Sequence, residues 1–390
     1  MKLTNRVRAI NPSVTLSVTA KAKAMKAKGI NVISFGAGEP DFDTPSYIKE
    51  AAKAAIDKGK TKYTPSIGTV ELRKAICDEL KRNSLLDYTP DEIIVSNGAK
   101  HSLYNIFQAI CEEADEVIIP SPFWVSYPEM VSLSGARPVM VKFSQKDSFK
   151  ATARAIKDAI NKKTKAIVLN SPNNPTGAVY DKDILEKIAE IAIKNNITVI
   201  SDEIYKMLIY DGKKHVSIAS FGDKIKKLTI VVDGVSKTYS MTGWRIGYLA
   251  SEMEELIKAI NNLQDHSTSN PSSISQEAAL CALKSDDGSV DKMRAEFEKR
   301  RNYMVDKINS IKGLSCVKPE GAFYCFCDIS KTKVKSLEFV EKLLQEAKVA
   351  VIPGEAFGWP THIRLSYALS MEDIIEGLDR IEKFVEKYYG

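Results

Sequence analysis

The chain has 390 residues, of which 44% are hydrophobic and 27% are charged, a balance typical of a soluble globular protein large enough for two domains. The formal net charge is +6, but lysines alternate with acidic residues, which argues against a nucleic-acid partner. No apolar run is long enough to span a membrane, so we expect no membrane association. The six cysteines and four histidines lack metal-ligand spacing, so we expect no metal and a cytoplasmic location.

The start of the chain is basic. No acidic residue precedes Glu39, and four lysines fall within the run KAKAMKAKG at residues 21–29. An amphipathic presequence would have such a composition. The Ala-rich sequence and its final glycine favour instead a surface helix whose lysines face water.

Farther along, short apolar runs alternate with segments of helical periodicity, a pattern typical of a mostly parallel sheet covered by helices. Before the sheet, Thr44 and Pro45 predict the N-cap and first residue of a helix that stops at Gly59. Another helix is predicted at 101–112. The predicted strands are 92–96, 116–119, 166–170, 198–201 and 228–232.

The character of the sequence changes near residue 292, where a long charged helix begins. Strands follow it, and a final amphipathic helix starts at Ser370. We therefore expect an N-terminal segment at 1–44, a large domain at 45–291 and a small C-terminal domain at 292–390. Because no Pro-rich linker or low-complexity tract separates these parts, we expect them to pack closely.

Residues suited to ligand binding follow the predicted strands, and a doubly wound sheet binds its ligands at the carboxyl ends of strands. After the first strand, SNGAK leads directly into a helix and offers free backbone N–H groups to a phosphate. A plain tight turn explains the same residues. After the second strand comes Trp124, which suits either a stacking platform or the core.

The later strand ends carry further groups. SPNNPTG presents Asn174, and the next strand end presents Asp202 and Tyr205, although an acid there also suits a helix cap. Lys237 and Arg245 follow the last strand, in SKTYSMTGWRIGY. A lysine held away from water has a lowered pKa and is available as an amine, whereas a lysine that extends into water has only a packing role.

Together these residues supply what pyridoxal 5'-phosphate requires. Its aldehyde needs a lysine, its pyridine nitrogen an acid, its phosphate a helix end and an arginine, and its ring a stacking group. Each residue alone has an ordinary structural explanation, but their coincidence favours the cofactor. The hypothesis is an enzyme in which Lys237 holds the cofactor as an imine.

The order of the motifs resembles the class I aminotransferases of fold type I, most of all the bacterial branch of aspartate aminotransferase. The resemblance covers the chain from its first residues to its last helix. It implies an α/β fold with a large, doubly wound, mostly parallel sheet domain and a smaller α/β domain. It also implies ping-pong transamination between L-aspartate and 2-oxoglutarate. The motifs are FGAGEPDF, YTPSIGTVELR, SNGAK, SPFW, NSPNNPTG, SDEIY, SKTYSMTGWRIGY and IRLSYA.

The resemblance implies roles in cofactor binding. Lys237 forms the imine and moves the substrate proton, Asp202 pairs with the pyridine nitrogen, and Tyr205 binds the ring oxygen. Trp124 stacks on the ring. The other implied cofactor contacts are Gly98, Ala99, Lys100, Asn174, Ser236, Arg245, and Tyr63 from the second subunit of a homodimer.

Substrate contacts are implied as well. Arg364 would hold the α-carboxylate as a bidentate fork, and Lys100 would meet the distal carboxylate. The N-terminal segment would form a lid across the site. The residues implied to contact substrate are Thr15, Gly38, Lys100, Trp124, Asn174 and Arg364.

Alternatives share part of this pattern. A prephenate aminotransferase, or an enzyme with both activities, would use the same two cations, because prephenate also carries two carboxylates. A β- or γ-lyase shares the cofactor and the fold, but Trp124 and Lys100 count against it. A ligand-sensing regulator would need a DNA-binding module, for which we expect no room. A dinucleotide site is disfavoured by Asp41, where a third glycine belongs.

One departure from the family pattern concerns the phosphate. Many relatives carry a serine three residues before the lysine as a phosphate ligand, and this chain has Gly234 there. Ser236 lies directly before Lys237. The phosphate contacts are therefore less firmly predicted than the lysine.

Overall fold

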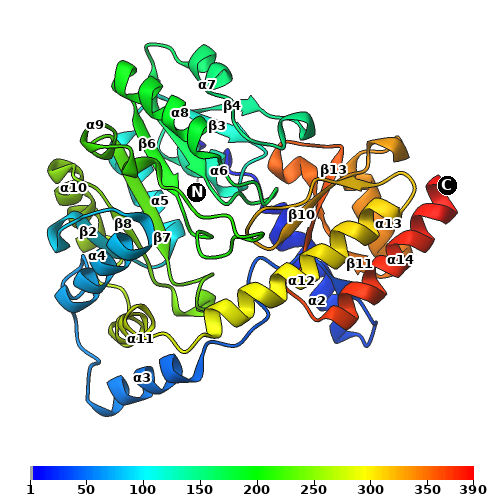
Figure 1. Ribbon diagram of the computed structural model, residues 1–390, viewed down its shortest axis with the longest axis horizontal. Coiled ribbons are helices and arrows are strands. Elements are labelled where there is room, and N and C mark those ends of the chain that lie inside the picture. Colours follow the sequence, from blue (N-terminus) through cyan, green and yellow to red (C-terminus); the bar gives the residue numbers. More distant parts are fainter. Residues whose placement is uncertain (1–2) are drawn as a thin grey trace.

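A seven-stranded sheet forms the centre of the larger part of the molecule in the computed structural model, which describes residues 3–390 (Figure 1). Its strand order is β2-β8-β7-β6-β5-β3-β4, and only β8 runs antiparallel to its neighbours. The sheet is therefore mostly parallel, as predicted. Its strands are β2 (Ile93–Ser96), β3 (Glu116–Ser121), β4 (Arg137–Lys142), β5 (Thr164–Asn170), β6 (Thr198–Asp202), β7 (Thr229–Gly234) and β8 (Gly247–Ala250).

Helices cover both faces of this sheet. Along β7, Ile230 and Val232 pack toward α5 and α10, while Val231 between them packs toward α4 and α11. Burial on both faces explains why the parallel strands are continuous apolar runs. The helices of this part are α3 (Ser46–Asp57), α4 (Val70–Ser84), α5 (Ala99–Ile110), α6 (Ser126–Leu133), α7 (Ala153–Ala159), α8 (Lys182–Asn195), α9 (Asp223–Lys226), α10 (Glu254–Asp265) and α11 (Ser273–Lys284).

Two predicted helix starts need correction. Thr44 does not cap α3, because its hydroxyl donates to the backbone oxygen of Ser240 at 2.6 Å, and Pro45 occupies the cap position. The helix predicted at 101–112 begins two residues earlier, directly after Gly98, whose φ of 90° sets the turn. It also ends earlier, at Ile110, because the next residue is extended.

The smaller part is built on a four-stranded antiparallel sheet of order β12-β13-β10-β9. A second, two-stranded sheet pairs β1 with β11 in parallel, so the N-terminal segment packs with the C-terminal part. The elements are β1 (Ile33–Ser34), β9 (Ser315–Cys316), β10 (Tyr324–Asp328), β11 (Val349–Ala350), β12 (Ile352–Pro353), β13 (His362–Ser366), α12 (Ser289–Ser310), α13 (Ser336–Ala347) and α14 (Met371–Tyr389).

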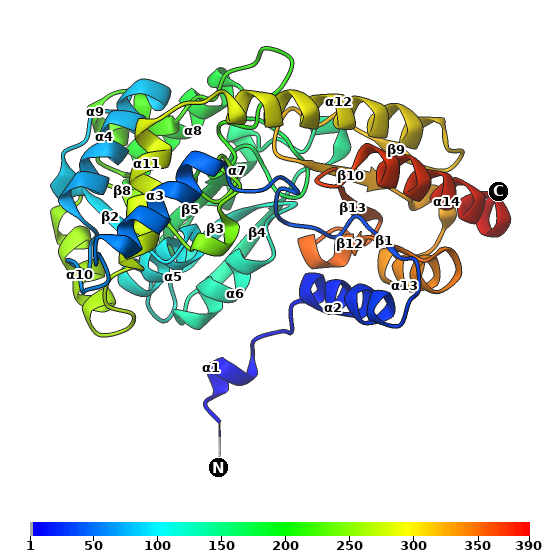
Figure 2. The ribbon, with the colours of Figure 1, turned by 90° about the horizontal axis from the view of Figure 1, so that it is seen from below.

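Helix α12 runs along the molecule from the larger part to the smaller sheet (Figure 2). It begins at Ser289 after Gly288, so the expected boundary at 291–292 falls within its first turn. The last helix follows the prediction, because the side chain of Ser370 caps it by accepting from the backbone of Asp373 at 3.1 Å.

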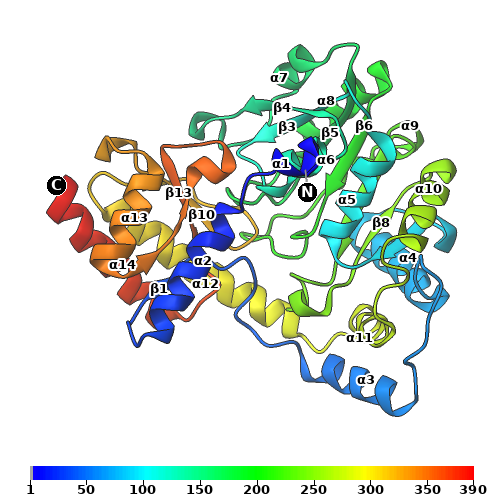
Figure 3. The same cartoon turned by 180° about the vertical axis from the view of Figure 1, so that it is seen from behind.

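The N-terminal segment passes from one part of the molecule to the other (Figure 3). Helix α1 (Asn5–Arg8) approaches α6, and α2 (Val14–Ala27) lies against β11 and β12. The lysines of α2 are exposed and Gly29 follows its end, as expected for a surface helix. Residues 1 and 2 of the expected segment lie outside the described residues. Within residues 3–390, no helix has the length and apolar character of a membrane span.

Candidate active site

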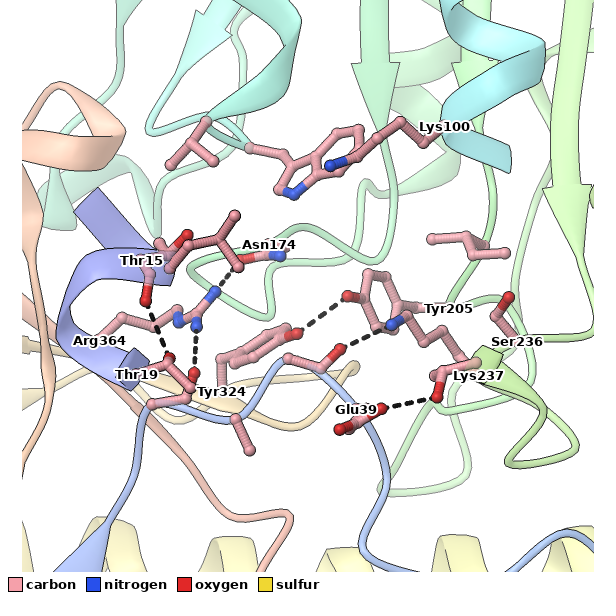
Figure 4. Close-up of a pocket in the computed structure, with 18 of the residues that line it drawn as sticks. Thr15, Thr19, Glu39, Lys100, Asn174, Tyr205, Ser236, Lys237, Tyr324 and Arg364 are labelled. Atoms are coloured by element: carbon pink, nitrogen blue, oxygen red, sulfur yellow. Dashed lines mark hydrogen bonds between the residues drawn. The ribbon is translucent and has the colours of Figure 1, made fainter. Parts of the chain in front are cut away.

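A cavity of about 720 Å³ lies at the carboxyl ends of β5, β6 and β7, and it is closed on its other side by α2, β10 and β13 (Figure 4). It brings together most residues predicted from the sequence. Gly98 adjoins the lining, whereas Tyr63 lies elsewhere, with 91% of its surface exposed. The predicted residues that line the cavity are Thr15, Gly38, Ala99, Lys100, Trp124, Asn174, Asp202, Tyr205, Ser236, Lys237, Arg245 and Arg364.

The amine of Lys237 points into the cavity just beyond the end of β7. Its Nζ donates to the backbone oxygen of Gly38 at 2.6 Å. Burial of the amine lowers the pKa of Lys237 to about 8, since a desolvated cation is disfavoured. A lysine with such a pKa is available as a nucleophilic amine near neutral pH, so it is not a surface lysine that extends into water.

The carboxylate of Asp202 ends β6 at the cavity wall. It accepts from the hydroxyl of Tyr127 at 2.5 Å and from the backbone N–H of Ile204 at 3.2 Å. Burial raises the pKa of Asp202 to about 6. No helix starts at this position, because the following residues form a turn, so the alternative of a helix cap is wrong.

Two tyrosine hydroxyls meet in the cavity. The hydroxyl of Tyr205 lies 3.0 Å from that of Tyr324, and the rings are 5.9 Å apart in an edge-on arrangement. Burial raises the pKa of both phenols, so both are protonated at neutral pH. Because the bond between them uses one of the two protons, the pair has one hydrogen available for a ligand oxygen.

Arg364 reaches the cavity from β13 with only 4% of its surface exposed. Its Nη1 donates to Asn174 at 3.0 Å and its Nη2 to the backbone oxygen of Gly36 at 3.2 Å. Its Nε, also buried, has no partner within residues 3–390. A buried guanidinium that contacts only neutral oxygens has a strong electrostatic preference for a carboxylate ligand.

The N-terminus of α5 forms an anion site at another wall. The backbone N–H groups of Ala99 and Lys100 have no acceptor among the described residues. Arg245 lies beside them, and its guanidinium donates to the backbone oxygens of Thr242 at 2.9 Å and Asn97 at 3.2 Å. A helix end with free N–H groups next to an arginine suits a phosphate.

Two glycines explain the shape of this anion site. Gly98 has a φ of 90°, a conformation that favours glycine, and a Cβ there would lie 2.4 Å from Nη2 of Arg245. A Cβ at Gly234 would lie 2.8 Å from both Gly247 and the oxygen of Ile246. A serine at position 234 therefore does not fit this backbone, whereas Ser236 lines the cavity.

Lys100 and Trp124 lie together at the cavity wall. The Nζ of Lys100 is 4.9 Å from the centre of the Trp124 ring, a cation–π distance. Burial and the charge of Arg245 lower the pKa of Lys100. Trp124 is half-buried, lines the cavity and also packs against the hydrophobic core, so its position is compatible with a stacking role. At the start of α2, on the other side of the cavity, the hydroxyl of Thr15 lies 2.9 Å from that of Ser13, which caps the helix.

A family model described as aminotransferase class I and II matches residues 30–381. The chain belongs to this family. The aminotransferase is 50% identical to the aspartate aminotransferase of Bacillus subtilis (strain 168), over the full length of both chains. It is also 50% identical to a protein of Aquifex aeolicus (strain VF5) named "Probable aspartate/prephenate aminotransferase", over 99% of each chain. The solved aspartate aminotransferase of Thermus thermophilus with maleate has a TM-score of 0.95 and 42% identity, covering 98% of this chain and 99% of that one.

Aminotransferases of this family depend on pyridoxal 5'-phosphate, and the cavity fits that group. The lowered pKa of Lys237, the buried carboxylate of Asp202 and the free N–H groups of α5 match its aldehyde, ring nitrogen and phosphate. Within the part of the chain that the structure describes, no group of three metal-binding side chains is present.

Sequence reasoning missed several residues of the aminotransferase cavity. Tyr127 and Tyr324 contact predicted residues from positions 75 and 119 residues away along the chain. Glu39 also borders the cavity and accepts from the hydroxyl of Thr242 at 2.6 Å. In the sequence, the two tyrosines were indicated only by aromatic residues beside predicted strands, in the runs SPFWVSY and AFYCFCD.

Proposed function

We propose that this aminotransferase exchanges the amino group between L-aspartate and 2-oxoglutarate, giving oxaloacetate and L-glutamate by a ping-pong mechanism. The observation that carries the proposal is a pair of cations on different elements of one cavity, Arg364 on β13 and Lys100 on α5. Neither has a carboxylate partner within residues 3–390. A substrate with two carboxylates satisfies both.

When bound, pyridoxal 5'-phosphate supplies an aldehyde that condenses with amines and a ring that accepts electrons. The residues of the chain provide the rest. Lys237 is the amine that carries a proton to and from the substrate α-carbon, and its lowered pKa suits a general base. Asp202 would hold positive charge at the ring nitrogen, and Tyr205 would donate to the ring oxygen together with Asn174, since all three line the cavity.

The positions of other residues at the cavity support further contacts. Gly98, Ala99, Ser236 and Arg245 would hold the phosphate, and Trp124 would stack against the ring. Arg364 orients the α-carboxylate, with support from Asn174 and the backbone near Gly38. Lys100 and Thr15 bind the distal carboxylate. The names of the Bacillus relative and of the Thermus structure, which was solved with the dicarboxylate maleate, support this assignment.

Prephenate is the second candidate acceptor, and an enzyme with both activities uses the same cations. The name of the Aquifex relative supports this alternative. A lyase activity is a weaker candidate, because Lys100 has no role in it.

The domain division, assembly and location are part of the proposal. Residues 1–44 form a lid with the small domain at 292–390 over the cofactor domain at 45–291, as the pairing of β1 with β11 supports. Tyr63 is 91% exposed and outside its own cavity, which supports a homodimer in which it reaches the phosphate of the other subunit. The free thiols support a cytoplasmic location. The proposed reaction places the enzyme in amino-acid metabolism.

The absorption spectrum of the purified protein, recorded with L-aspartate and without a keto acid, tests the function. A yellow band that aspartate converts to the amine form of the cofactor supports aspartate as the donor. Prephenate is then offered as acceptor in place of 2-oxoglutarate. A band that aspartate leaves unchanged rules out aspartate, and release of pyruvate and ammonia from a β-substituted amino acid supports the lyase.

A further inference from the structure

Tyr324 contacts both the phenol and the carboxylate-binding arginine of the cavity. Its hydroxyl lies 3.0 Å from the hydroxyl of Tyr205. The guanidinium carbon of Arg364 lies 4.4 Å from the centre of its ring. Tyr324 is fully buried and lines the cavity, as Figure 4 shows.

The sheet register holds Tyr324 in place. Tyr324 pairs with Ser366 across the β10–β13 ladder, and Arg364 pairs with Phe326. Tyr324 and Arg364 are therefore diagonal neighbours on the same face of an antiparallel pair, close enough for long side chains to contact. Phe323 packs 4.6 Å from the Tyr324 ring and 5.5 Å from the Tyr205 ring, which fixes the relative position of the two phenols.

The number of hydroxyl protons limits which tyrosine of the pair can donate to the other. Each hydroxyl has one proton, and the bond between them uses only one of the two protons. Either hydroxyl can donate in the bond between them, but a Tyr205 that donates its single proton to a ligand oxygen can only accept from Tyr324. Tyr205 then accepts from Tyr324 and keeps its own proton for a ligand oxygen. Donors in such a chain strengthen one another.

We propose that Tyr324 is a positioning residue that strengthens Tyr205 as a hydrogen-bond donor to the cofactor ring oxygen and supports the guanidinium of Arg364. The inference rests on the proposed function, since it needs a cofactor oxygen at Tyr205. The hydroxyl of Tyr324 serves the first role and its ring serves the second. The two roles are therefore separable by substitution.

The test is a pH titration of the absorption of the cofactor-loaded protein. Donation from Tyr205 stabilises the deprotonated, high-pH form of the bound chromophore. Tyr324→Phe removes the supporting hydrogen bond, so the chromophore pKa is expected to rise by about 0.5 to 1, the worth of one net hydrogen bond. The KM for aspartate is expected to change less than about twofold, because the ring remains under Arg364.

Tyr324→Leu removes both contacts. It is expected to raise the chromophore pKa and also the KM for aspartate by about tenfold, the effect of about 1.4 kcal/mol of lost guanidinium support. Tyr367→Phe is the matched control: Tyr367 is a buried phenol of the same part of the molecule, and its hydroxyl donates to the backbone oxygen of Ala322 at 3.2 Å. It is expected to leave the chromophore pKa unchanged.

A double-mutant cycle distinguishes positioning from a general loss of structure. In a Tyr205→Phe background, the further change Tyr324→Phe is expected to leave the chromophore pKa where it is. The inference is overturned if Tyr324→Phe leaves the chromophore pKa at its wild-type value. It is also overturned if Tyr324→Phe shifts the chromophore pKa equally in the wild-type and Tyr205→Phe backgrounds. If the wild-type chromophore titrates but aspartate does not react, the aspartate assignment fails and Tyr324 is still tested. A wild-type protein without cofactor absorption overturns both.

Discussion

The hydroxyl of Tyr127 donates to the carboxylate of Asp202 at 2.5 Å, although the two residues are 75 positions apart in the chain. The bond joins α6 to the end of β6 and holds the carboxylate at the cavity wall. The hydrogen bonds from Tyr127 and the backbone N–H of Ile204 do not offset the cost of burying the charge of Asp202. The pKa of Asp202 is therefore raised to about 6. The cofactor-free protein therefore carries a destabilising carboxylate at neutral pH.

Asp202→Asn is predicted to change the pH dependence of stability in the cofactor-free protein. The folded pKa of Asp202 is raised from 3.8 to about 6, so the folded state holds a proton that the unfolded state loses between these values. Stability therefore falls as pH rises through this window. Relative to wild type, the variant is expected to gain about 2 kcal/mol between pH 4 and pH 7. Urea unfolding at several pH values measures this, and a constant difference would contradict it.

Lys100→Ala is predicted to weaken binding of the distal carboxylate. Because Lys100 has no acidic partner in the described chain, its removal is expected to raise the KM for aspartate at least tenfold. The KM for alanine, which has no distal carboxylate, is expected to stay within about twofold. Lys146→Ala, at an exposed lysine outside the cavity, is the control. Equal effects on aspartate and alanine would show that Lys100 does not recognise dicarboxylates.

Gly98→Ala is predicted to weaken cofactor binding. The added Cβ would lie 2.4 Å from the guanidinium of Arg245 at a φ of 90°, so the arginine and the start of α5 must shift. We expect the dissociation constant of pyridoxal 5'-phosphate to rise at least tenfold in an equilibrium titration. Gly243→Ala is the matched control, since nothing lies within 4 Å of its Cβ position. Unchanged affinity in Gly98→Ala would mean that the phosphate does not bind at α5.

A buried charge cluster behind the cavity leads to a stability prediction. The amine of Lys206 lies 2.9 Å from Glu79 and 2.8 Å from Asp233, and the hydroxyl of Tyr248 lies 3.1 Å from both carboxylates. All four side chains are buried. Lys206→Met leaves two unpaired carboxylates there, so the free energy of unfolding is expected to drop by about 3–5 kcal/mol.

Urea unfolding of the cofactor-free protein measures the effect of Lys206→Met. Lys258→Met removes an exposed ion pair with Glu254 and serves as the control, for which no measurable change is expected. A small effect in Lys206→Met would mean that water reaches the cluster and solvates the two carboxylates.

The sequence by itself determined the class of fold and most of the site residues. Apolar runs such as that of β7 mark strands buried on both faces, because parallel strands under helices exclude polar residues. Residues at the ends of those strands lie at one edge of the sheet, so Lys237, Asp202 and Asn174 were predicted to meet from local pattern alone. The strands β4 and β8 were not predicted: β4 is a partly exposed edge, and β8 (GYLA) begins with glycine, a residue that is depleted in strands.

Only the tertiary structure decided which side chains support those residues. Tyr127 and Tyr324 reach Asp202 and Tyr205 from α6 and β10, and no periodicity links positions 75 and 119 residues apart. Thr44 shows the same limit, since a local rule assigns it to a cap and a contact with Ser240 takes its hydroxyl. Local pattern fixes backbone direction and burial, whereas the partner of a polar group depends on how distant elements pack.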